Sequence, residues 1–366
     1  MESLPLVSVV TPFYNTADFL AECIESVLRQ TYTNWEYVLV NNRSTDGSEE
    51  IVQRYVDRFP DKIRLVHTDS FLSQVKNYNY ALSLISANSK YCKMVQADDW
   101  IFPECLRSMV ELAEAHPKVA IVSAYELEGD HPSLGGLPYP SPEVPGRDIG
   151  RLYYEKNMPL FGTPTSLLML SEIVRSRNPS FYEERHAPFE DFFVCLDILR
   201  TWNFGFVHQV LTYSRRDNES ILSRIRPYSF ELFCRLAKVI SHGRYYLTEE
   251  EYPAYLKGAE RQYFLYLGLS ALQGRDSKFW EFHKERLASI NYSLNFAFMA
   301  KWISIVLLDW VGNPKRTCEY LWPRRMRIFQ AGTRFLRTIY RNFIHKRISG
   351  SADGVRVTSH TGLGHP

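Results

Sequence analysis

Residues 6–15 read Leu-Val-Ser-Val-Val-Thr-Pro-Phe-Tyr-Asn, and they decide how the chain begins to fold. Residues 6–10 form a mostly apolar, valine-rich run, which Thr11 and Pro12 close. Such a run is typical of a strand that is buried on both faces of a parallel sheet. We therefore predict that the first strand spans residues 6–10 and that a loop follows at residues 11–15.

Strands and helices alternate from this point. Apolar spacing predicts helices at residues 17–30, 48–59 and 74–86, and strands at residues 37–40, 63–67 and 91–95. This alternation is typical of a doubly wound α/β domain. Ligands of such sheets bind beyond the carboxyl ends of the strands, so we expect the loops at residues 11–15, 41–47 and 96–100 to converge on one crevice. The first turn has no GxGxxG sequence, which argues against dinucleotide binding.

The second half of the chain has a different pattern. Residues 129–146 are rich in proline and glycine and predict a long irregular loop, and a strand is expected at residues 167–170. Beyond Asp191 we expect mainly helices, at residues 228–241, 249–272, 278–290 and 296–310. The predicted organisation is a catalytic α/β domain at residues 1–225, a helical extension at residues 226–348 and a disordered tail at residues 349–366.

Charge is divided unevenly along the 366 residues, although the formal net charge is only +2. From residue 315 onward, eleven Lys and Arg residues accompany two acidic residues, so this segment carries +9 and the rest of the chain carries −7. The six cysteines are scattered without zinc-site spacing, which favours reduced thiols in the cytoplasm. No basic segment precedes the first apolar run, so we expect no secretory signal.

Two pairs of adjacent acids are the strongest chemical features. Asp98 and Asp99 follow the apolar end of a predicted strand, where two buried negative charges would be costly unless a divalent cation relieved them. Mg²⁺ or Mn²⁺ would suit these hard oxygen ligands and could bridge to a diphosphate. The alternative is a solvated turn. Glu190 and Asp191 open an apolar helix, where acids are favoured by the helix dipole in any case.

Four motifs in one order make a more specific pattern than any one of them. VSVVTPFYN, NNRSTDGS, the Asp98-Asp99 pair and the Glu190-Asp191 pair follow each other at plausible separations, and over residues 6–223 the chain resembles the family-2 glycosyltransferases, which have the GT-A fold. The resemblance implies an inverting, metal-dependent transfer of sugar from a nucleoside diphosphate. It implies that Asp191 is the general base and that Asp99 binds the metal. It further implies that the nucleotide sugar contacts Thr11, Pro12, Tyr14, Asn42, Lys76, Asn77 and Asp98.

Several positions depart from the family pattern. Asn42 stands where the family has an Asp that accepts a hydrogen bond from uracil, so a uridine nucleotide is only the default donor. Gln96 replaces a further Asp, and Asp217 replaces a His that helps to hold the metal or the diphosphate. Arg215 and Arg216 precede it, and they either clamp the diphosphate or are simply solvated.

The basic segment near the C-terminus has helical periodicity. Apolar residues from Ile328 to Phe343 fall on one helical face, with arginines mostly off it, which is typical of a helix that binds an anionic membrane surface. Docking of the apolar stripe on the catalytic domain is the alternative. No stacking or base-reading motif accompanies the charge, so nucleic acid is not an expected partner. We expect peripheral attachment to the cytoplasmic face of the cell membrane, where lipid-linked or glycan acceptors would be met.

Three functions are compatible with these features. An inverting glycosyltransferase of cell-surface polysaccharide or glycolipid synthesis accounts for Asp98, Asp99 and Asp191 together. A catalytically silent protein that binds sugar nucleotides or glycans would account for the altered Asn42, Gln96 and Asp217. A nucleotidyltransferase would need a glycine-rich basic loop near the N-terminus, and residues 11–15 are neither glycine-rich nor basic.

Overall fold

A computed structural model of the chain describes residues 4–133, 137–156, 160–216 and 228–313. The first half contains β1 (Val7–Phe13), α1 (Ala17–Leu28), β2 (Trp35–Asn41), α2 (Ser48–Arg58), β3 (Ile63–His67), α3 (Gln74–Ser83), β4 (Tyr91–Met94), β5 (Trp100–Ile101), α4 (Cys105–Ala115), β6 (Val119–Glu128), β7 (His131–Ser133), β8 (Glu143–Val144) and α5 (Gly146–Lys156). The second half contains η1 (Pro164–Ser166), β9 (Leu168–Leu170), α6 (Ser171–Ser176), η2 (Glu184–His186), α7 (Glu190–Ile198), β10 (Asn203–Ser214), α9 (Phe230–Tyr246), α10 (Glu251–Leu272), α11 (Ser277–Ala288) and α12 (Phe296–Gly312).

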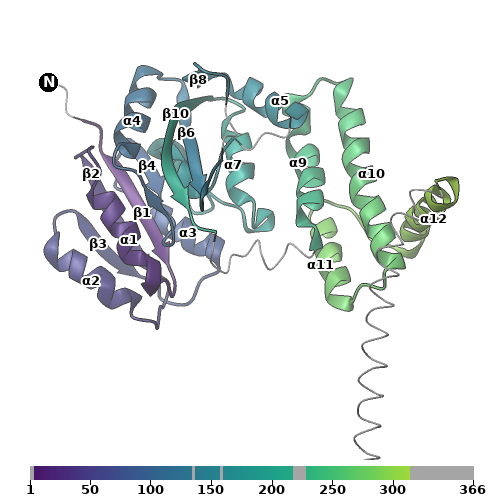
Figure 1. The fold of residues 1–366 in the computed structure, drawn as a ribbon, viewed down its shortest axis with the longest axis horizontal. Coiled ribbons are helices and arrows are strands. Elements are labelled where there is room, and N and C mark those ends of the chain that lie inside the picture. The colour runs from purple at the N-terminus through teal and green to yellow at the C-terminus, as the bar shows by residue number, and fades with distance from the viewer. Residues whose placement is uncertain (1–3, 134–136, 157–159, 217–227, 314–366) are drawn as a thin grey trace, which may run out of the picture. The chain divides into compact units, whose positions relative to one another are not determined.

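One mixed sheet organises the first part of the chain (Figure 1). Its main strand order is β3-β2-β1-β4-β9-β6-β10-β5. The long ladders, β1 with β2 and β4, β2 with β3, and β6 with β10, are parallel, and the short strands β5, β7, β8 and β9 pair antiparallel. The predicted fold class, a doubly wound and mainly parallel α/β sheet followed by helices, is confirmed. Because the strand order reverses between β1 and β4, the carboxyl ends of these two strands form a switch point at which ligands of such sheets bind.

The predicted N-terminal elements agree with the structure to within a few residues. The strand β1 is longer than expected, because Thr11, Pro12 and Phe13 continue its ladder with β2. The loop predicted at residues 11–15 therefore begins only after Phe13. The core packs α1 and α4 against the sheet, and its centre includes Val9, Ile24 and Tyr37, each fully buried.

One prediction about the middle of the chain was wrong, and one strand was missed. The segment at residues 129–146 is not uniformly irregular, since β7 and β8 lie within it and each pairs with a central strand. The chain beyond Asp191 is mainly helical, as predicted, but it also contains β10, a twelve-residue strand that was not predicted. Pairing with β6 places β10 in the interior of the sheet. Long-range pairing of this kind overrides local sequence preference.

The described residues divide into two compact units. The first contains the sheet and extends to residue 263, and it also includes residues 276–293, so that α9 and α11 belong with the sheet. Gly150 of α5 lies so close to Tyr246 of α9 that a side chain at this glycine would collide with the ring. The boundary expected at residues 225 and 226 falls in a segment outside the described residues.

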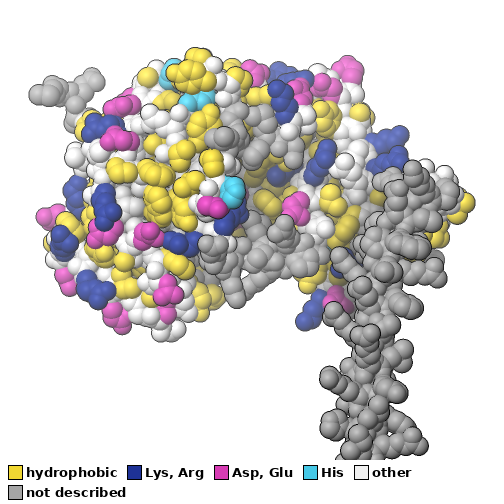
Figure 2. All heavy atoms as spheres, viewed as in Figure 1, with side chains coloured by type: hydrophobic (Ala, Val, Ile, Leu, Met, Phe, Trp, Pro, Cys, Tyr) yellow, Lys and Arg dark blue, Asp and Glu magenta, His cyan; other side chains and the backbone are white. Residues whose placement is uncertain are grey.

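The second unit contains residues 264–275 and 294–313 of the described chain. Phe264 packs edge-to-face on Phe298 of α12, with ring centroids 4.6 Å apart. Leu307, Leu308 and Val311 of α12 are 44, 70 and 79% exposed, and Figure 2 shows hydrophobic side chains on the surface at this helix. Across the described helices, none combines the length and the apolar character that crossing a membrane requires. The predicted basic helix and the tail lie outside the described residues.

Candidate functional site

The end of β1 lies beneath the switch point, and its residues Thr11 and Pro12 are buried rather than exposed. The Thr11 hydroxyl is fully buried, donates to the Val95 carbonyl at 2.7 Å and lies 2.8 Å from the Tyr37 hydroxyl. Pro12 is also buried. Tyr14 is 45% exposed and its ring packs edge-to-face against Phe71, which is 61% exposed. Thr11, Pro12 and Tyr14 are three of the expected nucleotide-sugar contacts, and of these three only Tyr14 presents its side chain to solvent.

Asn42 joins two neighbouring loops. Its amide oxygen accepts from the Leu72 N–H at 2.9 Å, and its amide nitrogen donates to the Leu72 carbonyl at 3.0 Å. The side chain is buried, so these bonds to the backbone fix its orientation. The Thr68 hydroxyl also donates to the Asn42 amide oxygen, at 3.3 Å. A nucleotide base that bound here would therefore meet an amide that already makes hydrogen bonds within the protein.

Lys76 and Asn77 lie in the first turn of α3. The Lys76 ammonium is largely exposed and pairs with Glu184 at 3.6 Å. Asn77 is buried, and its amide oxygen has no hydrogen-bond partner among the described residues. The two neighbours therefore point in different directions, one to the surface and one to the interior.

Asp99 is the most firmly held carboxylate of the site. One of its oxygens accepts from the Thr165 hydroxyl at 2.7 Å and from the Ser214 hydroxyl at 3.2 Å, and the other accepts from the Arg215 N–H at 3.0 Å. The residue is buried, and burial followed by the nearby charge of Asp98 raises its pKa to about 7. Its donors oppose this rise, because they favour the charged form.

Arg215 and Arg216 differ in their contacts. The Arg215 guanidinium donates to the Asp98 carbonyl at 3.0 Å, pairs with Glu22 of α1 and lies 4.5 Å from the centre of the Phe19 ring. It is therefore neither simply solvated nor free to clamp a ligand without giving up these contacts. Arg216 is half exposed and pairs with Glu128. Asp217 lies outside the described residues.

Glu190 and Asp191 form the first turn of α7, after the N-cap residue Phe189. Asp191 accepts from the Phe192 N–H at 2.8 Å. Burial raises the pKa of Asp191 to about 6, and this bond together with the charge of Lys238 holds it from rising further. Glu190 is buried, and one of its oxygens has no hydrogen-bond partner among the described residues. Burial and the charge of Asp191 raise the pKa of Glu190 to about 7.

One cavity of about 170 Å³ brings the two acidic pairs together. Of the predicted site residues, its lining contains Asp98, Asp99, Glu190, Asp191, Arg215 and Arg216. Thr11, Pro12, Tyr14, Asn42, Lys76 and Asn77 do not line it. The fold thus brings two distant segments to one cavity. The turn after β4 contributes Asp98 and Asp99, and the start of α7 contributes Glu190 and Asp191.

Lys238 of α9 is a charged residue that sequence reasoning missed. Its ammonium is buried, lies 3.5 Å from the centre of the Phe192 ring and donates to the Tyr153 hydroxyl at 3.2 Å. Burial lowers its pKa to about 8, while Asp191 acts in the opposite direction. The signal was a lysine inside the apolar run Leu236-Ala237-Lys238-Val239, which is unusual unless the charge is used.

The carboxylates fit a divalent cation that is shared with a ligand. The described residues contain no group of three or more His, Cys, Asp or Glu side chains that could hold a metal alone. Mg²⁺ is usually bound by one or two carboxylates together with substrate phosphates and water, and Mn²⁺ accepts the same oxygen ligands. Asp98 and Asp99 supply two such carboxylates on one cavity, so the donor set suits a cation held jointly with a diphosphate.

Comparison with known sequences gives one family. Residues 8–174 match the family described as Glycosyl transferase family 2. EpsE of Bacillus subtilis (strain 168), whose name assigns it to the glycosyltransferases, is 35% identical over 147 residues, which are 40% of this chain and 52% of that protein. The glycosyltransferase GlyG of Streptococcus pneumoniae serotype 4 is 30% identical over 120 residues, 33% of this chain and 39% of that protein. The chain thus matches about half or less of the length of these relatives.

A solved structure shares the fold over a longer stretch. Residues 1–349 of TarS from S. aureus, crystallised with UDP-GlcNAc, align with 77% of this chain and 79% of that chain, with a TM-score of 0.55 and 16% sequence identity. This likeness extends the shared architecture well beyond the segment that matches the family.

Proposed function

The chain belongs to glycosyl transferase family 2 through residues 8–174, and on this premise we propose that it is an inverting glycosyltransferase. The donor is a nucleoside-diphosphate sugar and the acceptor is a hydroxyl of a glycan or of a lipid-linked sugar in cell-surface polysaccharide or glycolipid synthesis. The observation that supports this most strongly is the single cavity lined by Asp98, Asp99, Glu190 and Asp191.

Asp191 is the proposed general base. Its carboxylate removes the proton of the acceptor hydroxyl while the oxygen attacks the anomeric carbon of the donor. The bond from that carbon to the diphosphate breaks, and the diphosphate leaves with the electron pair, so the configuration inverts. A pKa of about 6 leaves most of Asp191 ionised at neutral pH and still able to accept a proton.

Asp98 and Asp99 are the proposed binding groups for the donor. Asp99 is held in one orientation by Thr165, Ser214 and the Arg215 backbone, which suits a metal ligand that must not move. Asp98 is less buried and is the proposed ribose contact. A divalent cation, Mg²⁺ or Mn²⁺, would when bound neutralise the charge that develops on the leaving diphosphate.

UDP-sugars are the first donors to test. TarS, which shares the fold, has been crystallised with UDP and with UDP-GlcNAc. In this chain we propose Thr11, Pro12, Tyr14, Asn42, Lys76 and Asn77 as nucleotide contacts. Thr11 and Pro12 are buried and would act chiefly through the backbone, whereas Tyr14 is exposed enough to stack on a base.

We also propose that the enzyme attaches peripherally to an anionic, cytoplasmic membrane surface. The residues from 315 onward carry a charge of +9, and the exposed Leu307, Leu308 and Val311 of α12 come just before them. Apolar contact and attraction to anionic lipids act together in such segments. Flotation with anionic liposomes tests this, and equal recovery of a truncation before residue 315 would count against it.

The thermal stability of the full chain tests the donor. A ligand that binds only the folded state raises the melting temperature, so a panel of nucleoside diphosphates and nucleotide sugars is titrated with and without Mn²⁺. We expect a metal-dependent rise with one nucleotide class, lost in Asp99→Ala and kept in Glu104→Ala, which removes an exposed acid outside the cavity. No response to the whole panel would contradict the proposal, and release of pyrophosphate from a nucleoside triphosphate would indicate a nucleotidyltransferase.

A further inference from the structure

A second cavity lies beside the acidic pair of α7. It has a volume of about 310 Å³ and is lined by residues of α7 and α9, by Arg200, and by residues of the segments 177–186 and 289–291. This volume is at the lower end of the range for small-molecule sites. None of its residues was singled out by the sequence except Glu190, which lines this cavity and the smaller one described above.

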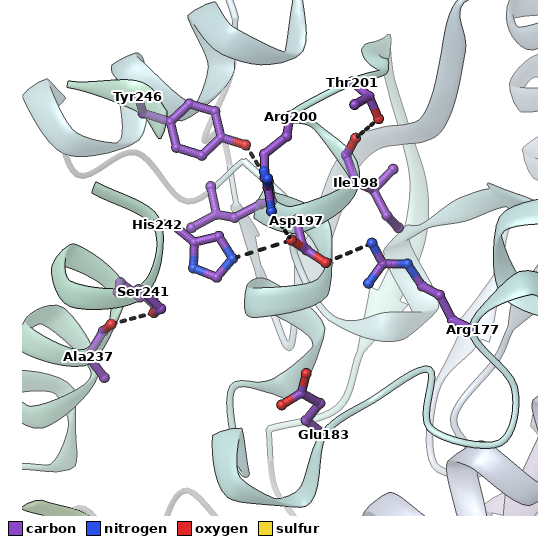
Figure 3. Close-up of polar contacts among 12 residues, drawn as sticks. Arg177, Glu183, Asp197, Ile198, Arg200, Thr201, Ala237, Ser241, His242 and Tyr246 are labelled. Carbon is purple, nitrogen blue, oxygen red and sulfur yellow. Dashed lines mark hydrogen bonds and ion pairs between the residues drawn. The ribbon is translucent and has the colours of Figure 1, made fainter. Parts of the chain in front are cut away.

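Asp197 is the centre of the polar contacts in this cavity (Figure 3). Its carboxylate pairs with Arg177 at 2.7 Å and with Arg200 at 3.1 Å, and the imidazole of His242 lies 4.0 Å away. A third arginine, Arg185, pairs with Glu183. Two of the three arginines of the lining share Asp197, and the lining contains one further acid, Glu190. Its three arginines and three acids balance in formal charge, and the arginines offer many N–H donors.

The histidines add hydrogen-bonding capacity without charge. Burial lowers the pKa of His186 and of His242 to about 4, so both rings are neutral at physiological pH. The His242 ring is buried, and its Nδ1 has no hydrogen-bond partner among the described residues. A neutral imidazole can donate from one nitrogen and accept at the other.

Flat aromatic surfaces complete the lining. The guanidinium of Arg200 lies 3.5 Å from the centre of the Tyr245 ring, and His186 stacks on Phe193 with ring centroids 3.9 Å apart. Phe181 and Phe233 are further members of the lining. Apolar faces with a few placed polar groups are what small-molecule sites generally present.

We propose that this cavity binds an uncharged sugar ring of the acceptor beside Glu190, which lines both this cavity and the one that contains Asp191. A ligand that fits this lining accepts hydrogen bonds from the arginine N–H groups, exchanges them with the neutral imidazoles and carries no net charge. Sugar hydroxyls meet these conditions, because they both donate and accept. The volume suits one ring rather than an extended chain. The inference rests on the proposed function, because it supplies the acceptor class for the same reaction.

Ligand-observed NMR on the full chain, with UDP and diamagnetic Mg²⁺ present, tests the inference directly. The probes are methyl glycosides of common neutral hexoses and N-acetylhexosamines, with methyl phosphate as the anionic probe. Ser241→Trp fills the cavity from α9, and Ser241 is exposed, so the substitution should leave the fold intact. Glu231→Trp is the matched control, because Glu231 is exposed on the same helix but does not line the cavity.

We expect at least one methyl glycoside to bind the wild type and Glu231→Trp and to lose at least tenfold in affinity in Ser241→Trp. Ser289→Trp, which fills the cavity from the end of α11, should have the same effect and replaces Ser241→Trp if that variant does not fold. The inference is overturned if no glycoside binds, if binding is unchanged in both blocking variants, or if only methyl phosphate is sensitive to them. The response to UDP is measured in parallel, so failure of the donor proposal is seen separately.

Discussion

The two acidic pairs share one cavity but are held in opposite ways. Asp99 accepts three hydrogen bonds from Thr165, Ser214 and Arg215, which leaves its carboxylate little freedom. In the pair at the start of α7, Asp191 accepts from its own turn and one oxygen of Glu190 has no partner among the described residues. A metal ligand works best when it is fixed, whereas a base needs a lone pair free for the incoming proton. The structure therefore holds in different ways two pairs that look alike in sequence, and each way suits the role proposed for that pair.

The sharpest test of this contrast is Asp191→Asn. The amide has the shape of the carboxylate but cannot take the acceptor proton, so turnover should fall by roughly 100- to 10,000-fold. The melting-temperature rise on adding the donor nucleotide and Mn²⁺ should remain, because the donor is assigned to the other pair. Both are measured on the same preparation. Loss of nucleotide binding along with turnover would break the division of roles.

Thr165→Val tests whether Asp99 depends on its fixed hydrogen bonds. The Thr165 hydroxyl donates to Asp99 at 2.7 Å and accepts from the Gln96 N–H at 3.1 Å, and it is fully buried. Valine leaves the part-buried Gln96 N–H without its acceptor and removes one of the three donors to Asp99, so the free energy of unfolding should fall by about 1–3 kcal/mol. Urea unfolding measures the change, and Thr33→Val at an exposed position is the control. A loss no larger than in the control would show that Asp99 is not held through this bond.

Lys238→Met tests the electrostatic support of the base. Burial raises the pKa of Asp191 to about 6, and the Lys238 charge is one of the influences that lower it. The base acts when ionised, so the rate should decline as pH falls through about 6 in the wild type. Without the lysine charge the pKa of Asp191 rises, and this decline should move to higher pH. The pH profile of transfer measures it, and Lys238→Arg should restore the original profile. A lower rate with an unchanged profile would indicate only a packing role.

Glu190→Gln should have the smallest effect. With a pKa of about 7, Glu190 is about half protonated at neutral pH, and glutamine resembles the protonated form. We expect turnover to change by less than about tenfold, with almost no change at pH 6. Initial rates at pH 6 and pH 8 measure this. A loss as large as that of Asp191→Asn would reverse the assignment of the base within the pair.

The sequence predicts where both pairs lie, because each follows from a local pattern. An apolar strand ends a few residues before Asp98, and an apolar helix starts at Glu190. The contacts that distinguish the pairs could not be predicted in this way, since Thr165 and Ser214 are 66 and 115 positions from Asp99. Only the pairing of distant strands brings them together.

The same limit explains the missed elements. Burial does not alternate along β10, since residues 204–206 are all buried and residues 209–210 are both exposed, and the register with β6 shifts between Val207 and Val210. No clear strand period is therefore visible in its sequence. In the sequence, Lys238 is only a charged residue that interrupts an apolar stripe. Its contact with Phe192 of α7, which lies far from it in sequence, is visible only in the structure. Helices and strands with a regular period were predicted well, whereas residues defined by tertiary packing were not.

The contact between Gly150 and Tyr246 limits where this chain can be joined to segments of other proteins. The ring of α9 occupies the space that any side chain at residue 150 would need, and its hydroxyl donates to the Leu196 carbonyl of α7. A chimera that joined the sheet to a foreign helical region near residue 225 would lose the Tyr246 ring, which fills the space beside Gly150. A domain exchange that keeps this packing would therefore have to move α9 and α11 together with the sheet.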